Sequence, residues 1–327
     1  MTPIYSRIIE GPSAWTPASL GGKEGLVHQL DASHLAALDS LLVKTRSKML
    51  EDLRREDFTD EGLAEFLDHV RHEVMNGRCA VVIRGVDRGR YGQEDCARIF
   101  WGIGSHLGTP AVQSSRADRL GYVRNEGAPR ARGYRGSGEL ALHTDSRAVI
   151  ALMSLQNAAT GGHSHLASGA TIHNMILRER PDLLEPLYRG YPYHSTEIEL
   201  TPCSIPVFSN VDGIVSCAFF ESHMRRAART RSEALPGDLD EALTYFAAVA
   251  RREDVRIEFM LEPGEIMVCN NFAVLHARTE FVNAPGQERL LLRLWLNVPN
   301  GRPIVPELLE RARRFDRNYD PLYVEAV

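Results

Sequence analysis

Several features that would assign a sequence to a special class are missing from this chain of 327 residues. No apolar run approaches the roughly 20 residues that a helix needs to cross a bilayer. The N-terminus (MTPIYSRIIEGPSAWTPASL) lacks the charged start and apolar stretch of a signal peptide. No internal repeat or low-complexity segment is present. We therefore expect a cytoplasmic protein that has no membrane partner.

Cysteine spacing and charge exclude further classes. The five cysteines are scattered and form no C-x-x-C pair, so neither a zinc site nor a redox pair is expected, and we interpret them as free thiols. The formal net charge is −5 and no long basic run occurs, which gives no electrostatic footprint for nucleic acid. A small-molecule partner is therefore expected, and the sequence leaves open whether the chain forms a homo-oligomer.

The composition permits one large core. With 43% hydrophobic and 25% charged residues, the chain is expected to form a single domain over residues 1–327. Apolar residues recur at helical spacing in HLAALDSLLVKTRSKML and GLAEFLDHVRHEV, which predicts an N-terminal helical flank over about 31–77. CAVVIRGV then predicts a short strand, and ARIFWGIGSHLG predicts a helix that ends at Gly108.

Short strands dominate the second half. They are expected in LALHTDSRAVIALMSLQNA, IPVFSNVDGIVSCAFF, RIEFMLEPGEIMVCNNFAVLHARTEF and RLLLRLWLNV. Asp212-Gly213 and Pro263-Gly264 supply turns between them, and IHNMILRERPDLLEPLYRG and LDEALTYFAAVARRE are expected as helical inserts. The pattern predicts an α+β, mainly β fold, in which a jelly-roll core over about 78–300 carries flanking helices.

One segment shows neither the helical nor the strand periodicity of apolar residues. Residues 116–138 are rich in glycine and arginine, and we expect them to form a loop. Most such loops have no special role, but this one lies just before the motif described next, which also makes an active-site lid a candidate.

Two residues of LALHTDS are candidate metal ligands. His143 and Asp145 are two residues apart, so on a strand both side chains leave the same face and can bind one ion. His276 in NNFAVLHAR, on a strand-like segment, is the candidate third ligand. Two imidazoles and one carboxylate on one side of a metal form the facial arrangement of non-haem Fe(II) oxygenases. An isolated H-x-D is common by chance, so the interpretation needs further support.

Other histidines form no comparable set. His163 and His165 in GGHSH could mimic a metal pair, but no third ligand is spaced to join them. We interpret both as structural.

Two arginines follow His276 on a predicted strand. Arg289 and Arg293 in ERLLLRLWL are four residues apart, so they share one face at a separation of roughly 13 Å. If that face points inward, the guanidinium groups require one or two carboxylate ligands in the barrel. If it points outward, the leucines pack and the arginines are solvated; the pattern alone leaves both open.

Most of Arg78 to Val298 is covered by an ordered set of segments: CAVVIRG, WGIGSHLGTP, LHTDS, GGHSHLASG, RPDLLEPLYRG, EFMLEPGEIMVCNNFAVLHART and RLLLRLWL. Together they resemble the taurine dioxygenase (TauD/TfdA, clavaminate synthase-like) family of Fe(II)/2-oxoglutarate-dependent oxygenases. That family has a double-stranded β-helix, a jelly-roll type of fold, in agreement with the strand pattern.

The resemblance implies site residues and cofactors. It places His143, Asp145 and His276 on the iron ligands. It places Arg289 on the arginine that binds 2-oxoglutarate, and Ser164 on a helper hydroxyl that is commonly threonine. Arg293 falls where some relatives contact the anionic end of the substrate. Fe(II), 2-oxoglutarate and O2 are therefore the expected cofactors.

The implied activity is hydroxylation of an unactivated C–H of a small anionic metabolite, such as an amino acid or other carboxylate, with succinate and CO2 as co-products. Related halogenases lack the carboxylate at the position of Asp145, so halogenation is disfavoured. The same ferryl chemistry ending in desaturation, cyclisation or epimerisation stays open. So do a cupin-type metalloenzyme without 2-oxoglutarate and a non-catalytic binding protein. Candidate substrate contacts, besides Arg293, are Arg116, Arg119, Arg124, Arg130, Arg132, Arg135 and Asn157.

Overall fold

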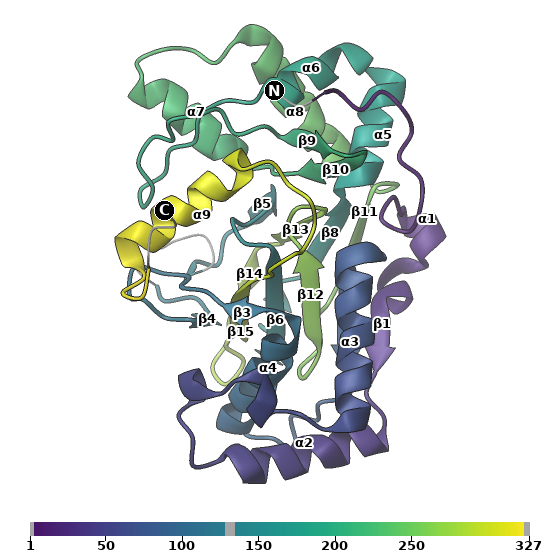
Figure 1. The fold of residues 1–327 in the computed structure, drawn as a ribbon, viewed down its shortest axis with the longest axis vertical. Coiled ribbons are helices and arrows are strands. Elements are labelled where there is room, and N and C mark those ends of the chain that lie inside the picture. The colour runs from purple at the N-terminus through teal and green to yellow at the C-terminus, as the bar shows by residue number, and fades with distance from the viewer. Residues whose placement is uncertain (1–2, 128–134, 324–327) are drawn as a thin grey trace.

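A computed structural model describes residues 3–127 and 135–323. It shows a mixed α/β fold in which two sheets lie at the centre and helices gather at both ends of the molecule (Figure 1). Among the described helices, none combines the length and apolar character that crossing a bilayer requires.

The larger sheet has seven strands in the order β1-β2-β12-β6-β15-β3, and β4 also pairs with β15. Their bounds are β1 Val27–Gln29, β2 Ala80–Arg84, β3 Thr109–Pro110, β4 Leu120–Val123, β6 Val149–Gln156, β12 Ile266–Asn270 and β15 Leu290–Asn297. All described pairs of this sheet are antiparallel except β1 with β2.

The smaller sheet is antiparallel and has the order β11-β8-β13-β5. Its strands are β5 Leu140–His143, β8 Ser164–Ser168, β11 Arg256–Phe259 and β13 Val274–Arg278. Two further ribbons pair β9 Phe208–Val211 with β10 Ile214–Cys217, and β7 Thr160–Gly161 with β14 Phe281–Val282. Asp212 and Gly213 join β9 to β10 with φ angles of 52° and 85°, as a two-residue hairpin turn requires.

An apolar core lies between the two sheets. Ile150, Met267 and Leu291 of the larger sheet belong to one buried cluster with Leu166 and Val274 of the smaller sheet. Side chains alternate along each strand, so neighbouring residues of β15 point the other way and contribute to a second cluster on the outer face. The sheets therefore pack face to face, and each turns its other face towards helices.

Helices from the N-terminal part cover the outer face of the larger sheet. They are α2 Ala32–Thr45, α3 Glu61–Asn76 and α4 Gln93–Leu107. Asp31 caps α2 by accepting from the backbone N–H groups of Ser33 and His34, and Asp60 caps α3 by accepting from Leu63. The predicted helical flank and the predicted strand-helix pair are thus confirmed.

Helices from the middle of the chain cover the outer face of the smaller sheet. They are α5 Gly169–Glu179, α6 Leu184–Arg189 and α8 Gly237–Ala250. A short helix, α1 Pro17–Leu20, precedes β1, and the remaining helices are α7 Glu221–Thr230 and α9 Glu307–Tyr319, both seen at the left of Figure 1. The sequence pattern did not predict α7 or α9.

The structure corrects the prediction of a loop over residues 116–138. Leu120 to Val123 form β4, which pairs with β15 so that Leu120 lies opposite Leu294. A segment of four residues is too short for the alternation of a strand to be recognised in the sequence. These residues form a strand because they pair with the edge of β15. Residues 128–134 lie outside the described part, so the lid stays a prediction.

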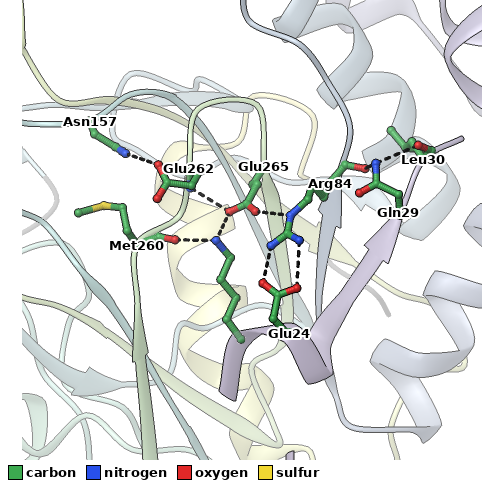
Figure 2. A network of polar contacts seen from close by, with 9 residues as sticks. Glu24, Gln29, Leu30, Arg84, Asn157, Met260, Glu262 and Glu265 are labelled. Atoms are coloured by element: carbon green, nitrogen blue, oxygen red, sulfur yellow. Dashed lines mark hydrogen bonds and ion pairs between the residues drawn. The ribbon is translucent and has the colours of Figure 1, made fainter. Parts of the chain in front are cut away.

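An ion-pair network joins the N-terminal segment to the larger sheet (Figure 2). Glu265, 4% exposed, accepts from Arg84 Nε at 2.8 Å and from Lys23 Nζ at 2.6 Å. Arg84 also donates two hydrogen bonds to Glu24, at 2.7 and 3.0 Å. The backbone N–H of Glu262 donates to Glu265 Oε2 at 2.9 Å. One buried carboxylate thus neutralises two cations from separate segments.

We expect Glu265→Ala to lower the free energy of unfolding by about 2 kcal/mol, because two cations lose their buried partner while Arg84 keeps some solvent. Urea denaturation followed by circular dichroism measures the change. Glu24→Ala is the matched control: Glu24 binds the same arginine, but its side chain is 69% exposed, so its loss should have the smaller effect. Equal effects of the two substitutions would contradict the assignment of Glu265 as the centre of the network.

Candidate metal centre and its two cavities

Three candidate ligands meet at one end of the smaller sheet. His143 is the last residue of β5 and pairs across the ladder with His276 of β13. Asp145 follows in the connection to β6. The nearest ligand atoms of the three side chains lie within 4.8 Å of one another, and within residues 3–127 and 135–323 no other group of His, Cys, Asp and Glu does so. The structure therefore brings together the residues that the sequence singled out.

The reason for this convergence differs from the predicted one. The sequence argument put His143 and Asp145 on the same strand, but β5 ends at His143 and Asp145 lies in the connection that follows. There the carboxylate lies between the imidazoles. Asp145 Oδ1 is 3.8 Å from His143 Nε2, and Asp145 Oδ2 is 3.6 Å from His276 Nε2.

Neighbouring groups orient the candidate ligands. His143 Nδ1 contacts the carbonyl of Ala141 at 2.8 Å, and an Nδ1–H donated to this carbonyl leaves Nε2 as the lone pair for an ion. Trp295 Nε1 of β15 donates to Asp145 Oδ2 at 2.7 Å. The backbone N–H of Asp145 donates to the side chain of Asn271 at 3.3 Å. Each contact reduces the freedom of a donor atom before any ion binds.

Burial and mutual charge set the protonation states. Burial, together with the charge of His276, lowers the pKa of His143 to about 3. Burial alone would raise the pKa of Asp145, but the hydrogen bond and charge of His276 outweigh it and hold that pKa well below the usual value. At neutral pH His143 is therefore a neutral imidazole and Asp145 a carboxylate, which are the forms that ligate a divalent cation.

One cavity, which we call the inner cavity, lies between the sheets beside all three candidate ligands. Its polar lining consists of His143, Asp145, His276, Ser164, Arg278, Arg289 and Arg293, and its apolar lining includes Val123, Ile150, Leu152 and Met267. Cations outnumber carboxylates along these walls. The inner cavity is thus suited to an anion that reaches the metal centre.

Arg289 is buried without an acidic partner among the described residues. It is 5% exposed, its Nη1 has no hydrogen-bond partner within that part of the chain, and its guanidinium lies over the Phe281 ring at 5.2 Å. Burial, and then the charge of Arg278, lower the pKa of Arg289 to about 9. Because a guanidinium binds a carboxylate with two parallel hydrogen bonds, an incoming carboxylate would relieve this cost.

Arg278 supplies a second buried cation to the inner cavity. Burial lowers its pKa to about 10. Its guanidinium, like that of Arg289, lies over the Phe281 ring, at 4.6 Å from the ring centre. Arg278 donates to the carbonyls of Thr279 and Gly136 at 3.1 Å each, and also to that of Gly138. This arginine therefore fixes the chain before β5 to the wall of the cavity.

A glycine turn makes room for Arg289. Gly161 and Gly162 have φ angles of 73° and 81°, and a Cβ on Gly162 would lie 3.1 Å from Arg289 Nε. Thr279 Oγ1 holds the turn by accepting from the backbone N–H groups of Gly162 and His163, both at 3.0 Å. The turn ends where β8 begins, which places the buried Ser164 on the cavity wall.

A second cavity, the outer cavity, also borders the metal centre and has a volume of about 220 Å³. It shares His143, Asp145, Leu140 and Arg293 with the inner cavity; its further lining is Ser146, Ser195, Thr196, Glu197, Ile198, Phe220, His223, Trp295, Arg311 and Phe315. Arg293 is 5% exposed, donates from Nε to Gln113 Oε1 at 2.7 Å and lies over the Trp295 ring. Two cavities thus border the candidate metal centre, and Arg293 lines both.

Two histidines interpreted as structural, and one candidate substrate contact, lie away from the metal centre. His165 contacts Glu258 at 2.9 Å, and His163 lies 3.9 Å from the same carboxylate, away from the three candidate ligands. Asn157 belongs to the network of Figure 2, where its side chain donates to Glu262 at 3.3 Å, so the structure removes it from the candidate substrate contacts.

The arginines of residues 116–138 also have separate positions. Arg119 pairs with Asp320 at 2.7 Å, and Arg116 and Arg135 lie 3.9 and 3.8 Å from Glu126. Arg124 and Arg116 line a surface pocket that reaches Arg289 from outside. Arg130 and Arg132 lie outside the described residues.

The sequence argument missed four residues of the site. Arg278 and Trp295 share a strand face with His276 and Arg293, and this alternation was a usable signal. Arg311 lies on α9 with the buried Leu308, Ala312 and Phe315, so an arginine on the apolar face of an amphipathic helix was the clue. His223 gave no signal, because the α7 pattern was not recognised as a helix.

Comparison with known proteins adds relatives. One is the "FR-33289 synthase" of Streptomyces rubellomurinus, 27% identical over 92% of this chain and 94% of its own. Another is the "Taurine hydroxylase-like protein SAT17" of Stachybotrys chartarum, 29% identical over 86% of this chain and 77% of its own.

Solved structures share the fold. An asparagine oxygenase, in complex with Fe(II), 2S,3S-3-hydroxyasparagine and succinate, is 16% identical with a TM-score of 0.67, covering 83% of this chain and 93% of its own. The non-heme iron oxygenase OrfP, in complex with Fe and alpha-ketoglutaric acid, is 15% identical with a TM-score of 0.63, covering 83% and 94%.

A family model shows where the chain belongs. The model described as "Taurine catabolism dioxygenase TauD, TfdA family" matches residues 47–295, which include His143, Asp145, His276, Arg289 and Arg293. The match covers the smaller sheet, the larger sheet apart from β1 and the end of β15, and the whole candidate metal centre. The chain therefore belongs to the TauD/TfdA family, and it is a non-haem Fe(II)/2-oxoglutarate-dependent dioxygenase.

Proposed function

We propose that this enzyme hydroxylates an unactivated C–H of a small anionic metabolite, such as an amino acid or other carboxylate. In this proposal His143, Asp145 and His276 hold Fe(II), Arg289 and Ser164 hold 2-oxoglutarate in the inner cavity, and the substrate occupies the outer cavity. When bound, the iron and 2-oxoglutarate supply the oxidising chemistry with O2, and succinate and CO2 are the co-products.

The observation that carries the proposal is the burial of Arg289 without an acidic partner among the described residues. A guanidinium in such a place is costly unless an anion joins it. The inner cavity connects it to all three candidate ligands, so one molecule that bears a distal carboxylate and a chelating end fits both requirements. A cupin-type metalloenzyme without a keto acid would have no use for this arginine.

The donor set fits iron. Two imidazoles and one carboxylate match the facial triad of non-haem Fe(II) oxygenases, and the pKa shifts favour the deprotonated donors. Trp295 and the carbonyl of Ala141 hold two of the three ligands in place. The apolar walls of the inner cavity exclude water from the cosubstrate, which strengthens the ionic contacts there.

Arg293 supports an anionic substrate. It lines the outer cavity as well as the inner one, whereas Arg289 does not line the outer cavity, so we assign Arg289 to the cosubstrate and Arg293 to the substrate. The names of solved relatives point the same way, because one is a complex with hydroxyasparagine and another a complex of OrfP with (3S)-hydroxy-L-Arg. Both of those molecules carry a carboxylate.

We also propose that the two packed sheets form a double-stranded β-helix within a single domain. The antiparallel strands around the shared core, residues 80–297, support this topology. Such a core presents side chains of both sheets to one interior, which is where the candidate ligands and arginines are found.

Anaerobic titration of the Fe(II)-loaded protein with 2-oxoglutarate tests the cosubstrate. We expect the weak visible charge-transfer band of the iron-bound keto acid to develop. Arg289→Met should raise the 2-oxoglutarate concentration needed by about 30-fold or more, because a desolvated ion pair loses one partner.

Arg116→Met is the control. Arg116 is largely exposed and lines the surface pocket that also reaches Arg289, so its substitution should leave the titration unchanged. If wild-type protein that is properly loaded with Fe(II) gives no charge-transfer band, the proposed function is wrong.

Arg293→Ala should raise the KM for the substrate far more than the KM for 2-oxoglutarate, because the lost cation faces the outer cavity. Succinate formation with the best substrate from a screen of small amino acids and carboxylates measures both constants. Arg119→Ala, whose arginine pairs with Asp320, serves as control. Equal rises in the two constants would overturn the division between Arg289 and Arg293.

A further inference from the structure

Trp295 contacts the carboxylate of Asp145 from a fixed place in the fold. It lies on β15 opposite Ile150 of β6, and its carbonyl accepts a hydrogen bond from the backbone N–H of Ala111 at 2.8 Å. Its side chain is 3% exposed and belongs to the apolar core between the two sheets. A strand that is paired on both sides therefore holds the indole N–H at the candidate metal centre.

The indole selects one of the two oxygens of the carboxylate. Trp295 Nε1 donates to Asp145 Oδ2 at 2.7 Å, which is a hydrogen bond to a charged acceptor. The two imidazoles are farther away, since His143 Nε2 lies 3.8 Å from Oδ1 and His276 Nε2 lies 3.6 Å from Oδ2. Of these three nitrogens the indole nitrogen is the closest, so Trp295 makes Oδ2 different from Oδ1.

Burial makes this contact hard to replace. Both side chains are buried, and a buried acceptor that loses its donor loses free energy because little water takes the donor's place. Indole has a single donor and no acceptor, so its N–H would also be left without a partner if the carboxylate turned away. Both groups therefore favour the arrangement in which Oδ2 faces Trp295.

The number of oxygens that Asp145 offers decides how many positions stay free on the metal. With one oxygen, the three candidate ligands occupy one face of an octahedral ion, and a chelating keto acid takes two of the three remaining positions. One position is then left for O2. Carboxylates can also bind a metal through both oxygens, and in that case Asp145 would occupy the last position as well.

We propose, on the basis of the function proposed above, that Trp295 is a positioning residue that keeps this last position open. By holding Oδ2, the indole N–H limits Asp145 to one metal-binding oxygen, Oδ1. A merely structural role would be to orient the whole carboxylate. Loss of that role would weaken iron binding, but it would leave the free position of an iron-saturated protein unchanged.

Nitric oxide tests the proposal, because it binds Fe(II) in place of O2 and gives an electron paramagnetic resonance signal without turnover. The protein is saturated with Fe(II) and 2-oxoglutarate in the absence of O2, and nitric oxide is titrated in. Trp295→Phe keeps an aromatic ring and removes the N–H. We expect this variant to bind nitric oxide about 10-fold or more weakly than wild type.

The same samples report on the cosubstrate. The 2-oxoglutarate concentration that gives half of the charge-transfer band should change by less than about threefold in Trp295→Phe, because the contacts of Arg289 are untouched. A Trp295→Phe protein that gives no band at all would contradict the proposal, since Asp145 would then need the indole to bind iron in any form.

Two further variants identify the N–H as the cause. Trp101→Phe removes another buried indole N–H, which donates to the carbonyl of Leu53 at 3.2 Å beneath the N-terminal helices, and it should bind nitric oxide as wild type does. Trp295→Gln places an amide N–H the same number of bonds from the backbone as the indole N–H. This variant should recover part of the affinity for nitric oxide.

Two results would show that the proposal is wrong. One is wild-type affinity for nitric oxide in iron-saturated Trp295→Phe, which would mean that Trp295 only orients the carboxylate. The other is a Trp295→Gln protein that binds nitric oxide as weakly as Trp295→Phe. Wild-type protein without the charge-transfer band would overturn the proposed function and this role together, whereas a band with unchanged nitric oxide binding in Trp295→Phe overturns only the role of Trp295.

Discussion

The antiparallel pairing of β5 with β13 is the constraint on which the candidate metal centre depends. It places His143 directly opposite His276, although the two residues are 133 positions apart in the sequence (276 − 143 = 133). Leu142 of β5 and Leu275 of β13 pack in the core beneath the helices, and Val274 of β13 packs in the core between the two sheets. The apolar core therefore fixes the register, and the register fixes the distance between the imidazoles.

Around this pairing the charges divide into two environments. The inner cavity is bordered by Arg278 and Arg289, whose lowered pKa values reflect burial in an apolar setting. The outer cavity combines Arg293 and Arg311 with Glu197. Asp145 and His143 border both cavities, so both reach one centre, as an enzyme that brings a cosubstrate and a substrate to the same metal requires.

Much of this could be predicted from the sequence because strands repeat with a period of two. Alternation in LALHTDS and ERLLLRLWL indicated which residues could share a strand face, and the order of the motifs carried the family resemblance, whereas the pattern alone left open whether Arg289 and Arg293 point inward. The approach of α9 could not be predicted, since nothing local to Arg311 tells which loop its helix packs against. Asn157 failed as a substrate contact for the same reason, because its partner Glu262 is 105 residues away.

The β5–β6 connection is supported by α9, which follows both sheets in the sequence. Arg147 pairs with Asp316, and the Thr144 carbonyl accepts a hydrogen bond from Arg311. Both sheets, by contrast, are complete by Asn297. Since a chain emerges from the ribosome N-terminus first, the strands can pair before α9 exists. The connection that carries Asp145 thus acquires the contacts from Arg311 and Asp316 only after α9 has been synthesised, so the metal centre depends on a helix that follows both sheets in the sequence.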